Sequence, residues 1–333
     1  MRDLGTLATL PKAHLHLHLT GGMRPATLLE LAEEQGKRLP EGLLRPGGLE
    51  GVARRGWFKF QRLYDAARDT LRGPEDVARI VHEIAEDEAA AGSGWVEVQV
   101  DPSSYAAKLG GLTGAVEVVL DAMRSASTDT GVGMAMVVAA NRTRHPGDAE
   151  TLARVARRYA GRGVVGFGLS NDETRGDTRA FAKAFRIARD SGLASVPHAG
   201  ELRGPGSVRA AVESLAPARL GHGIRADEDP EVLDLLVVRG VVLEVCPASN
   251  VALGVRPSVA DVPVLRLRRA GLEVALGADD PLLFRSGLLD QYAPYDDATA
   301  ADLAASSIRG SLAPPAVKAR LLAGVDTWLA APP

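Results

Sequence analysis

The sequence predicts an α/β fold, a (β/α)8 or TIM barrel with a helical insertion after the first strand. Three observations support it: short apolar runs typical of buried strands, helix-length segments between them, and eight such runs along the chain. Alternating strands and helices imply a parallel sheet, and eight units imply a closed barrel. A chain of 333 residues suits one such unit, so we expect 1–333 to form a single domain.

The expected strands and helices alternate from one end of the chain to the other. The strands are expected at Ala13–Leu19, Trp95–Val100, Met134–Ala139, Val164–Leu169, Ala194–Pro197, Arg219–Gly221, Val241–Val245 and Glu273–Leu276. Helices are expected at Pro25–Gln35, Glu75–Ala91, Ala149–Ala160, Thr178–Ser191, Ser207–Ala216, Pro230–Arg239 and Val264–Ala270. Several of the strands are apolar throughout, as expected for parallel strands covered on both faces.

The interval from Leu19 to Trp95 is far longer than one barrel helix requires. We expect a helical lid insertion there, roughly residues 22–92, over the barrel mouth. The insertion carries a cluster of aromatic side chains, namely Trp57, Phe58, Phe60 and Tyr64. These rings either pack the inserted helices onto the barrel or contact a substrate, and the sequence favours neither interpretation.

The composition excludes several classes of protein. Apolar residues make up 46% of the chain, and 39 basic residues nearly balance 42 acidic ones, without a basic stripe that would favour nucleic acid. There is no apolar stretch of membrane-spanning length and no signal-peptide pattern at the N-terminus. We therefore expect a cytoplasmic protein without nucleic-acid or membrane partners, its oligomeric state left open. The single cysteine, Cys246, excludes an internal disulfide and a zinc site built on cysteines.

The strongest chemical signal is the run His14-Leu15-His16-Leu17-His18 in the first expected strand. Side chains alternate along a strand, so we expect all three imidazoles on one face, with His14 deeper in the barrel. His16 and His18 would lie roughly 6.6 Å apart, at about 3.3 Å of rise per residue, so both can reach one metal ion. Buried imidazoles need hydrogen-bond partners, which this apolar strand lacks, so metal binding is favoured over core packing.

Other polar residues follow three further strands. They are His198 and Glu201 after the fifth strand, His222 after the sixth, and Asp279 and Asp280 after the eighth. Each alone is weak evidence, because paired Asp residues often form a turn and Gly-His-Gly is often only a tight turn. All strand ends of a barrel face one mouth, however, and a zinc-type site needs a third ligand and an open position. Their joint placement therefore predicts a metal-dependent active site.

Five motifs resemble those of the adenosine deaminase family. They are Pro11–Gly21 (family pattern H-x-H-L-D-G), His198–Glu201 (H-A-G-E), Arg219–Gly223 (R-L-G-H-G), Val245–Asn250 (C-P-x-S-N) and Ala278–Phe284 (T-D-D-P-x-x-F). The motifs occur in the family order and together span most of the chain. The resemblance implies metal-dependent hydrolytic deamination of a 6-aminopurine to the 6-oxopurine, with release of ammonia.

The resemblance also implies a role for each matched residue. His16, His18, His198 and Asp279 would bind one divalent cation, which in this family is usually zinc. Such a His3Asp set also accepts iron, cobalt or manganese. Glu201 would protonate N1 of the purine, His222 would orient and help deprotonate the water, and Asp280 would hydrogen-bond the purine toward N7. The chemistry agrees, since zinc lowers the pKa of bound water to about 7 and a carboxyl of raised pKa can deliver a proton.

Three departures from the family pattern concern the substrate. Thr20 stands where adenosine deaminases carry an Asp that grips the ribose 5′-hydroxyl and adenine deaminases often carry a Glu. Asn171 replaces a Gly whose backbone contacts the purine, and Gln99 replaces an Arg. We therefore predict a larger or anionic 5′ group, such as the keto-benzoate arm of aminodeoxyfutalosine in menaquinone biosynthesis. Lys59 and Arg62 are candidates to bind its carboxylate, or else they belong to a solvated helix face.

Several alternatives stay open. The substrate is otherwise adenosine, adenine or another aminoheterocycle such as a pterin, and the alternative of a different class is a non-catalytic purine-binding protein. A cytidine-deaminase zinc site needs P-C-x-x-C, which one cysteine cannot supply. Binuclear barrel hydrolases often bridge their metals with a modified lysine on the fourth strand, and Val164–Leu169 has none. One metal ion and a small-molecule purine are thus the expected cofactor and partner.

Overall fold

The computed structural model describes residues 4–49 and 56–331, so residues 50–55 of the expected insertion and both chain ends lie outside it. Within the described residues the strands form one eight-stranded parallel sheet in chain order. They are β1 (Lys12–His18), β2 (Ser93–Val100), β3 (Gly133–Asn141), β4 (Val164–Ser170), β5 (Ala194–Ala199), β6 (Arg219–His222), β7 (Val242–Val245) and β8 (Val274–Leu276). All eight expected strands are confirmed, with bounds that differ by a few residues.

The sheet closes on itself between β1 and the residues after β8. Leu17 and Asp279 form a parallel bridge there. The Asp279 N–H donates to the His16 carbonyl, and the His18 N–H donates to the Asp279 carbonyl, both at 3.0 Å. These bonds complete the barrel that the sequence predicts.

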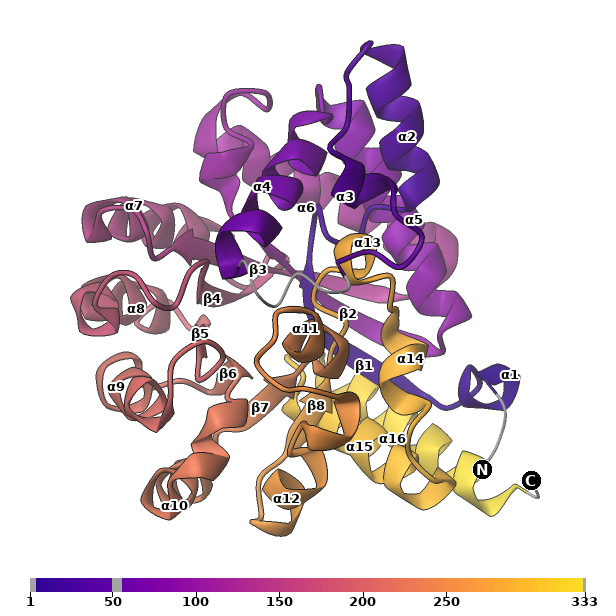
Figure 1. Ribbon diagram of the computed structural model, residues 1–333, viewed down its shortest axis with the longest axis vertical. Helices are drawn as coiled ribbons and strands as arrows, with labels where there is room; N and C mark the ends of the chain where they lie inside the picture. The colour runs from indigo at the N-terminus through magenta and orange to yellow at the C-terminus, as the bar shows by residue number, and fades with distance from the viewer. Residues whose placement is uncertain (1–3, 50–55, 332–333) are drawn as a thin grey trace.

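Helices surround the barrel, and Figure 1 shows α7, α8, α9 and α10 following one another around the outside of the strands. The helices are α1 (Leu4–Leu7), α2 (Pro25–Glu34), α3 (Glu41–Leu44), α4 (Gly56–Asp69), α5 (Pro74–Ala90), α6 (Gly111–Thr130), α7 (Pro146–Ala156), α8 (Ala182–Arg189), α9 (Pro205–Leu215), α10 (Pro230–Arg239), α11 (Pro247–Ala252), α12 (Val264–Arg269), α13 (Pro281–Phe284), α14 (Leu288–Tyr292), α15 (Asp297–Gly310) and α16 (Pro315–Ala330). The long helices α6, α15 and α16 were not among those expected from the sequence. The many Ala and Ser residues of α15 explain this in part, because they weaken its apolar period.

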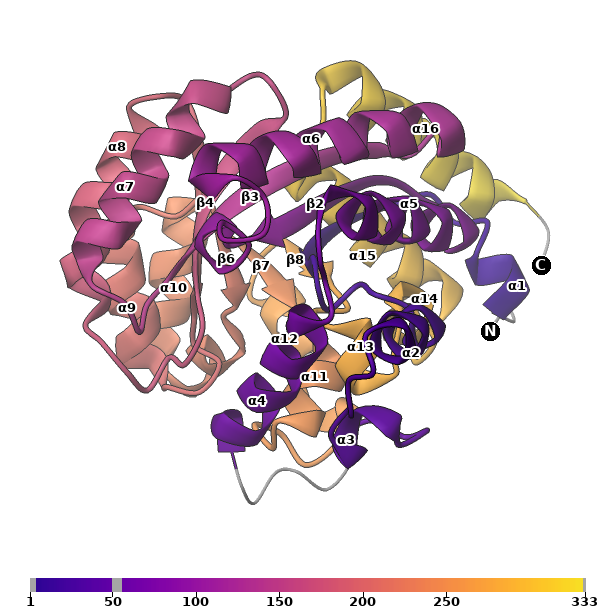
Figure 2. The ribbon, with the colours of Figure 1, turned by 90° about the horizontal axis from the view of Figure 1, so that it is seen from above.

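The described residues between β1 and β2 form four helices. The last of them, α5, packs against β2 and α6 as a member of the outer ring. Figure 2 shows α3 and α4 apart from that ring, on another side of the barrel from α6 and α7. Helix α4 lies against α13, where the Phe60 and Phe284 rings stack with centroids 5.6 Å apart. Movement of α2, α3 and α4 as a lid stays a prediction.

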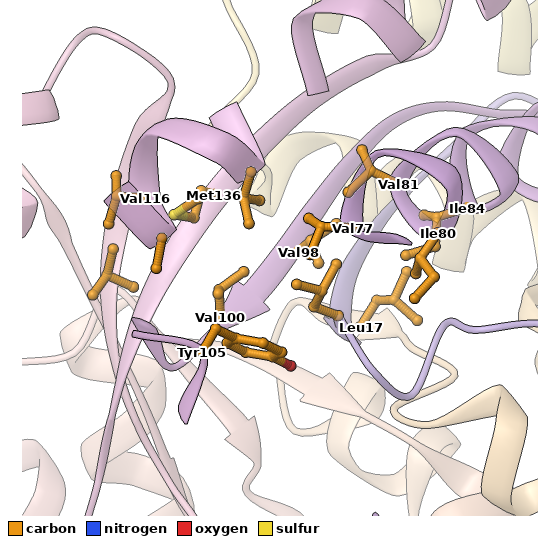
Figure 3. Close-up of a cluster of buried hydrophobic side chains, with 14 of the residues drawn as sticks. Leu17, Val77, Ile80, Val81, Ile84, Val98, Val100, Tyr105, Val116 and Met136 are labelled. Atoms are coloured by element: carbon orange, nitrogen blue, oxygen red, sulfur yellow. The ribbon is translucent and has the colours of Figure 1, made fainter. Parts of the chain in front are cut away.

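The largest apolar layer lies between the strands and the outer helices. Figure 3 shows Leu17 of β1 and Val98 of β2 facing α5. The helix presents Val77, Ile80, Val81 and Ile84, which are at most 2% exposed. Their spacing places them on one helical face, and burial of each such side chain contributes about 1.5–3 kcal/mol. This layer holds β1 and β2 rigidly, and both strands carry residues of the site described below. None of the described helices combines the length and apolarity needed to cross a membrane.

Strand β1 contains a β-bulge that changes where His14 points. His14 pairs with Val96 of β2, and the next paired residue, Leu17, pairs with Val98. Three steps on β1 therefore match two on β2, which reverses the alternation of side chains. His14 consequently faces the same side of the sheet as Leu17, toward the outer helices.

The hydrogen bonds of His14 agree with this orientation. Its Nδ1 lies 2.6 Å from Glu88 Oε1 on α5, and its Nε2 accepts the Ala278 N–H at 2.9 Å. The expectation that His14 shares a face with His16 and His18, deeper in the barrel, is therefore wrong. An alternating sequence carries no mark of the bulge, which arises from the pairing with β2.

A buried ion network crosses the barrel interior. Arg219 on β6 donates to Glu97 on β2, the strand opposite it in the barrel, and to Glu244 on β7 at 2.5 Å. The three side chains are at most 1% exposed. Glu244 also accepts a hydrogen bond from His16 Nδ1 at 2.8 Å. The network therefore connects the barrel interior to the first of the predicted metal ligands.

Replacing Arg219 with Met should strongly destabilise the protein. The change leaves Glu97 and Glu244 as buried carboxylates without their cation, which costs about 3–5 kcal/mol of unfolding free energy. Urea denaturation measures the loss. The control Arg239→Ala, at the exposed end of α10, should change the unfolding free energy by less than about 0.5 kcal/mol. Equal stability of the two variants would contradict a structural role for the network.

Candidate active site

A pocket opens at the carboxyl ends of the strands, under α4. It encloses about 660 Å³, part of it open to solvent. The floor comes from residues at or just after strand ends, and the roof comes from Trp57, Phe60 and Tyr64 of α4. Seven of the predicted site residues line the described wall: His18, Asn171, His198, Glu201, His222, Asp279 and Asp280.

Four imidazoles and one carboxylate converge at the floor. The ring centroids of His16, His18, His198 and His222 lie 4.6–5.4 Å apart in the five closest pairs. Asp279 Oδ1 lies 3.5 Å from His16 Nε2 and 3.3 Å from His18 Nε2. Residues from β1, β5, β6 and the segment after β8 therefore share one centre, although they are far apart in the sequence.

The donor atoms at this centre fit a metal cation. His16 Nε2 and His198 Nδ1 are buried and have no hydrogen-bond partner among the described residues, which is uncommon for buried polar atoms. Nitrogen and carboxylate donors are the ligands that zinc and related divalent metals prefer. Ser249 Oγ donates to Asp279 Oδ2 at 2.5 Å, and Glu244 holds the far nitrogen of His16. Such outer hydrogen bonds orient metal ligands.

The charges at the centre favour a cation as well. Burial opposes protonation of His16, but Asp279 and Glu244 outweigh it and raise the pKa of this imidazole to about 10. Burial opposes ionisation of Asp279, but the neighbouring imidazoles of His16 and His18 outweigh it and hold the pKa of this carboxyl well below the ordinary value. The two carboxylates near His16 therefore favour positive charge at this centre. Without a metal, a proton on His16 supplies it, and a bound cation would supply it instead.

Cys246 is also close to this centre, within 4.8 Å of donor atoms of His16 and Asp279. Burial, together with the nearby Asp279, raises the pKa of its thiol well above the usual value. In the absence of a metal, the sulfur is therefore a neutral thiol.

Glu201 and His222 form a pair with opposite protonation preferences. Burial, with Asp279 as the next cause, raises the pKa of Glu201 well above its ordinary value. Burial, with His16 as the next cause, lowers the pKa of His222 to about 3. Glu201 Oε1 lies 3.6 Å from His222 Nε2. At neutral pH the pocket thus presents a protonated carboxyl and a neutral imidazole, a combination suited to acid–base catalysis.

Two of the floor residues adopt strained backbone conformations. His222 and Asp279 have φ of 62° and 63°, in the left-handed region that residues other than glycine rarely adopt. Such strain persists where the surrounding structure enforces it, often at functional sites. Next to His222, a Cβ added at Gly221 would lie 2.9 Å from His16 Cε1, so only glycine fits there.

Glu173, in the loop after β4, has a structural role that the sequence pattern did not reveal. Its carboxylate accepts the backbone N–H groups of residues 200–203 at 2.6–2.9 Å and the Ser207 hydroxyl at 2.6 Å. These bonds shape the turn after β5, which carries Glu201. The only sequence signal is an acidic residue shortly after an expected strand, which by itself does not identify partners on the next loop.

The predicted substrate-binding residues differ in their placement. Asp280 lines the wall with a buried, unpartnered Oδ1. Asn171 lines the wall too, and its side chain donates to Gln61 of α4 at 3.0 Å. Thr20 is fully buried behind the described wall, where its hydroxyl lies 2.7 Å from the Tyr105 hydroxyl.

Gln99, Lys59 and Arg62, which the sequence also connects with the substrate, differ in their positions relative to the pocket. Gln99 lines the wall. Lys59 and Arg62 do not belong to the described wall, and Arg62 lines a separate hollow beside Leu29 and Pro40. Both side chains fall on the face of α4 turned away from the pocket, because the α4 residues that line it are Trp57, Phe60, Gln61, Tyr64 and Arg68.

Comparison with known proteins identifies the family. The sequence profile described as adenosine deaminase matches residues 11–328. The chain belongs to the adenosine deaminase family. A protein of Streptomyces coelicolor, provisionally named an adenosine/adenine deaminase, is 58% identical and covers 99% of this chain and 100% of its own. The aminodeoxyfutalosine deaminase of Acidothermus cellulolyticus is 34% identical over 87% of this chain and 83% of its own.

A solved structure agrees with the family assignment. The adenine deaminase of Arthrobacter aurescens superposes with a TM-score of 0.87 at 31% identity, over 96% of this chain and 99% of that one. The barrel and the order of its elements are therefore those of the family.

We expect Glu173→Gln to lower the pKa of Glu201. The negative charge of Glu173 is one of the causes that raise this pKa, after burial and Asp279, and the amide removes that charge. Titration of the Glu201 carboxyl by NMR in the metal-free protein measures the change. The unfolding free energy should also fall by about 1–3 kcal/mol, because the amide group faces backbone N–H donors.

The matched control is Ser207→Ala, which removes one hydrogen bond to Glu173 but keeps its charge. This variant should leave the pKa of Glu201 where it is. An unchanged pKa in Glu173→Gln would mean that Glu173 does not influence Glu201.

Proposed function

We propose that this chain hydrolyses the 6-amino group of an adenine- or adenosine-type purine, giving the 6-oxopurine and ammonia. The observation that carries the proposal is the shared centre of His16, His18, His198 and Asp279 on a pocket floor that also holds Glu201 and His222. Membership of the adenosine deaminase family, whose amidohydrolase-type members are generally metal-dependent, supports it.

We propose that one divalent cation, zinc, is held by His16, His18, His198 and Asp279. When bound, the cation makes a water molecule acidic enough to act as a nucleophile at neutral pH. His222, neutral because of its lowered pKa, orients that water and accepts a proton from it. These residues supply the nucleophilic half of the reaction.

The purine half of the reaction falls to the two buried carboxyl groups. Attack at C6 moves an electron pair onto N1, and Glu201, protonated because of its raised pKa, donates a proton there. Burial and the neighbouring Asp279 also raise the pKa of Asp280 well above its ordinary value. A protonated Asp280 is a hydrogen-bond donor, which suits the acceptor N7 of a purine. The proton held by His222 then passes to the departing amino group, and the hydroxyl at C6 gives its proton to the ionised Glu201. Loss of ammonia leaves the 6-oxo group, with both side chains returned to their starting states.

The proposed substrate is an adenosine modified at the 5′ position, such as aminodeoxyfutalosine of menaquinone biosynthesis. Thr20 has no carboxylate for a ribose 5′-hydroxyl, and its own hydroxyl is engaged by Tyr105. The aminodeoxyfutalosine deaminase of Acidothermus cellulolyticus is a relative that supports the proposal. Adenine is the second candidate, supported by the likeness to the adenine deaminase of Arthrobacter aurescens.

Glu201→Gln should decrease kcat/KM about 10²–10⁴-fold, because the amide keeps the shape of the side chain but has no acidic proton. Ammonia release measures the rate, and elemental analysis should find the same metal content as in the unchanged protein. Glu213→Gln, on the exposed face of α9, is the control and should keep full activity. Equal rates for the two variants would remove Glu201 from the mechanism.

Removal of the metal should abolish activity, and zinc should restore it. Dialysis against a chelator and readdition of zinc, iron, cobalt or manganese, each followed by an ammonia assay, identify the working cation. Activity that persists after complete removal of metal would contradict the proposed role of the four ligands.

Measurement of kcat/KM on aminodeoxyfutalosine, adenosine and adenine should decide the substrate. We expect the first to be preferred, since the pocket offers no carboxylate at Thr20. A strong preference for adenosine would end the 5′-substituent proposal. No ammonia from any aminopurine or aminopterin, with metal bound, would indicate a purine-binding protein instead.

A further inference from the structure

The active-site pocket continues outward into a second hollow, which we call the vestibule. It is bounded by α4 and the loops after β3 and β4 and encloses about 840 Å³, part of it open to solvent. Six residues line both spaces, namely Trp57, Gln61, Arg68, Ser104, Asn141 and Asn171. The two spaces are therefore continuous, and together they extend well beyond the volume that a purine ring needs.

Two arginines distinguish the vestibule from the pocket. Arg144, in the loop after β3, and Arg175, in the loop after β4, line the vestibule and are exposed. Neither guanidinium forms an ion pair or a hydrogen bond with any described residue. Both backbones are held in turns, because the Arg144 N–H donates to Asn141 and the Arg175 N–H donates to Asp172, at 3.1 and 3.0 Å. Among the described residues, two guanidinium groups without a partner are thus presented beside one opening.

Neither carboxylate of the vestibule forms an ion pair with Arg144 or Arg175. Asp65 accepts hydrogen bonds from Arg68 at 2.7 Å and from Gln61 at 2.8 Å. Asp172 accepts the Thr174 hydroxyl at 2.6 Å and the Thr174 N–H at 3.0 Å. Asp65 is therefore paired with a cation of its own helix, and Asp172 offsets one of the two positive charges, so that Arg144, Arg175 and Asp172 together leave a net positive charge at the opening.

The direction of the pocket determines what reaches the vestibule. In the proposed function, Glu201 and Asp280 bind the N1 and N7 edges of the purine at the closed end of the pocket. A substituent on the opposite side of the purine must then extend toward the opening, past Gln61 and Asn171. An arginine fork binds phosphate and carboxylate groups through paired hydrogen bonds. A negatively charged end on that substituent would meet Arg144 and Arg175.

We propose that the vestibule is a binding subsite for an anionic group, a phosphate or a carboxylate, at the far end of the substrate's sugar arm. Arg144 and Arg175 determine this specificity, in place of the Lys59 and Arg62 that the sequence indicated. The inference rests on the proposed deaminase function, and it assigns to that function a class of substrate and the residues that select it.

The test compares substrates that differ only at the 5′ position. With the metal-loaded enzyme, kcat/KM is measured for adenosine, for adenosine 5′-monophosphate and for adenosine 5′-carboxylic acid. We expect at least one anionic substrate to be preferred over adenosine, and the preference to decrease as salt is added, because the arginines are exposed. The anionic substrate with the higher kcat/KM shows whether the natural group is a phosphate or a carboxylate.

The double variant Arg144→Ala/Arg175→Ala should lower the ratio of kcat/KM for the preferred anion to that for adenosine by about tenfold. Arg144→Lys/Arg175→Lys should keep most of the ratio, because the positive charges remain. The matched control is Arg239→Ala, an exposed arginine in the last turn of α10, at the opposite end of the barrel, and it should leave the ratio unchanged. Because all three arginines are exposed, the variants should fold alike, and their melting temperatures check this.

The outcomes separate the two proposals. Turnover of adenosine with the same anion-to-adenosine ratio in the wild-type and double-alanine proteins overturns the vestibule subsite and leaves the deaminase function standing. If no 6-aminopurine is turned over, the deaminase function fails, and calorimetric titration with inosine and inosine 5′-monophosphate then decides the subsite. Equal affinity of the two ligands for the wild-type protein overturns it, and tighter binding of the monophosphate that is lost in the double variant supports it.

Discussion

The structure depends most on the contact between Asp279 and β1. Two backbone hydrogen bonds from this one residue, to His16 and His18, close the barrel at its last seam. The side chain of the same residue lies within 3.5 Å of both imidazoles. The same contact therefore closes the barrel and brings the candidate metal ligands together. Asp279 adopts a left-handed backbone conformation, which is unfavourable for a residue other than glycine. This conformation lets one residue both close the barrel and direct its carboxylate at the two imidazoles.

Buried charge in this molecule is of two kinds. Arg219 forms ion pairs with both Glu97 and Glu244 within the barrel, and Glu244 also accepts a hydrogen bond from His16. Glu201 and Asp280, in contrast, each keep a buried carboxyl oxygen without a partner. A folded protein keeps few such groups unless they have a task, because an unsatisfied buried polar atom costs free energy. The partnered charges lie in the barrel interior, outside the described wall of the pocket, and the unpartnered ones line that wall, where they are positioned to meet a ligand.

The mouth of the barrel is built from different parts of the chain than the floor. The floor residues follow strands, so the sheet determines their positions. The roof comes from α4, which contacts the barrel through Phe60 on Phe284 and through the hydrogen bond between Gln61 and Asn171. In the proposed function, chemistry and substrate selection therefore belong to separate elements, and the selecting elements can change without disturbing the proposed metal ligands.

The sequence by itself determined the eight strands and the residues on the floor of the pocket. Apolar runs report burial directly, and the carboxyl ends of barrel strands face one mouth whatever the loops do. For this reason the sequence alone predicts that one site contains His16, His18, His198, His222 and Asp279.

Only the tertiary structure decided the rest, because it depends on partners distant in sequence. The bulge that turns His14 outward arises from pairing with β2, and Glu173 acts on a turn in the next loop. Which face of α4 meets the barrel depends on packing, and that packing turns Arg62 away from the pocket. The loops that bring Arg144 and Arg175 to one opening are neighbours because β3 and β4 pair in parallel. The sequence gives the type of each residue and the periodicity of apolar residues around it. The features named here depend instead on the residues that contact it from other strands, helices and loops.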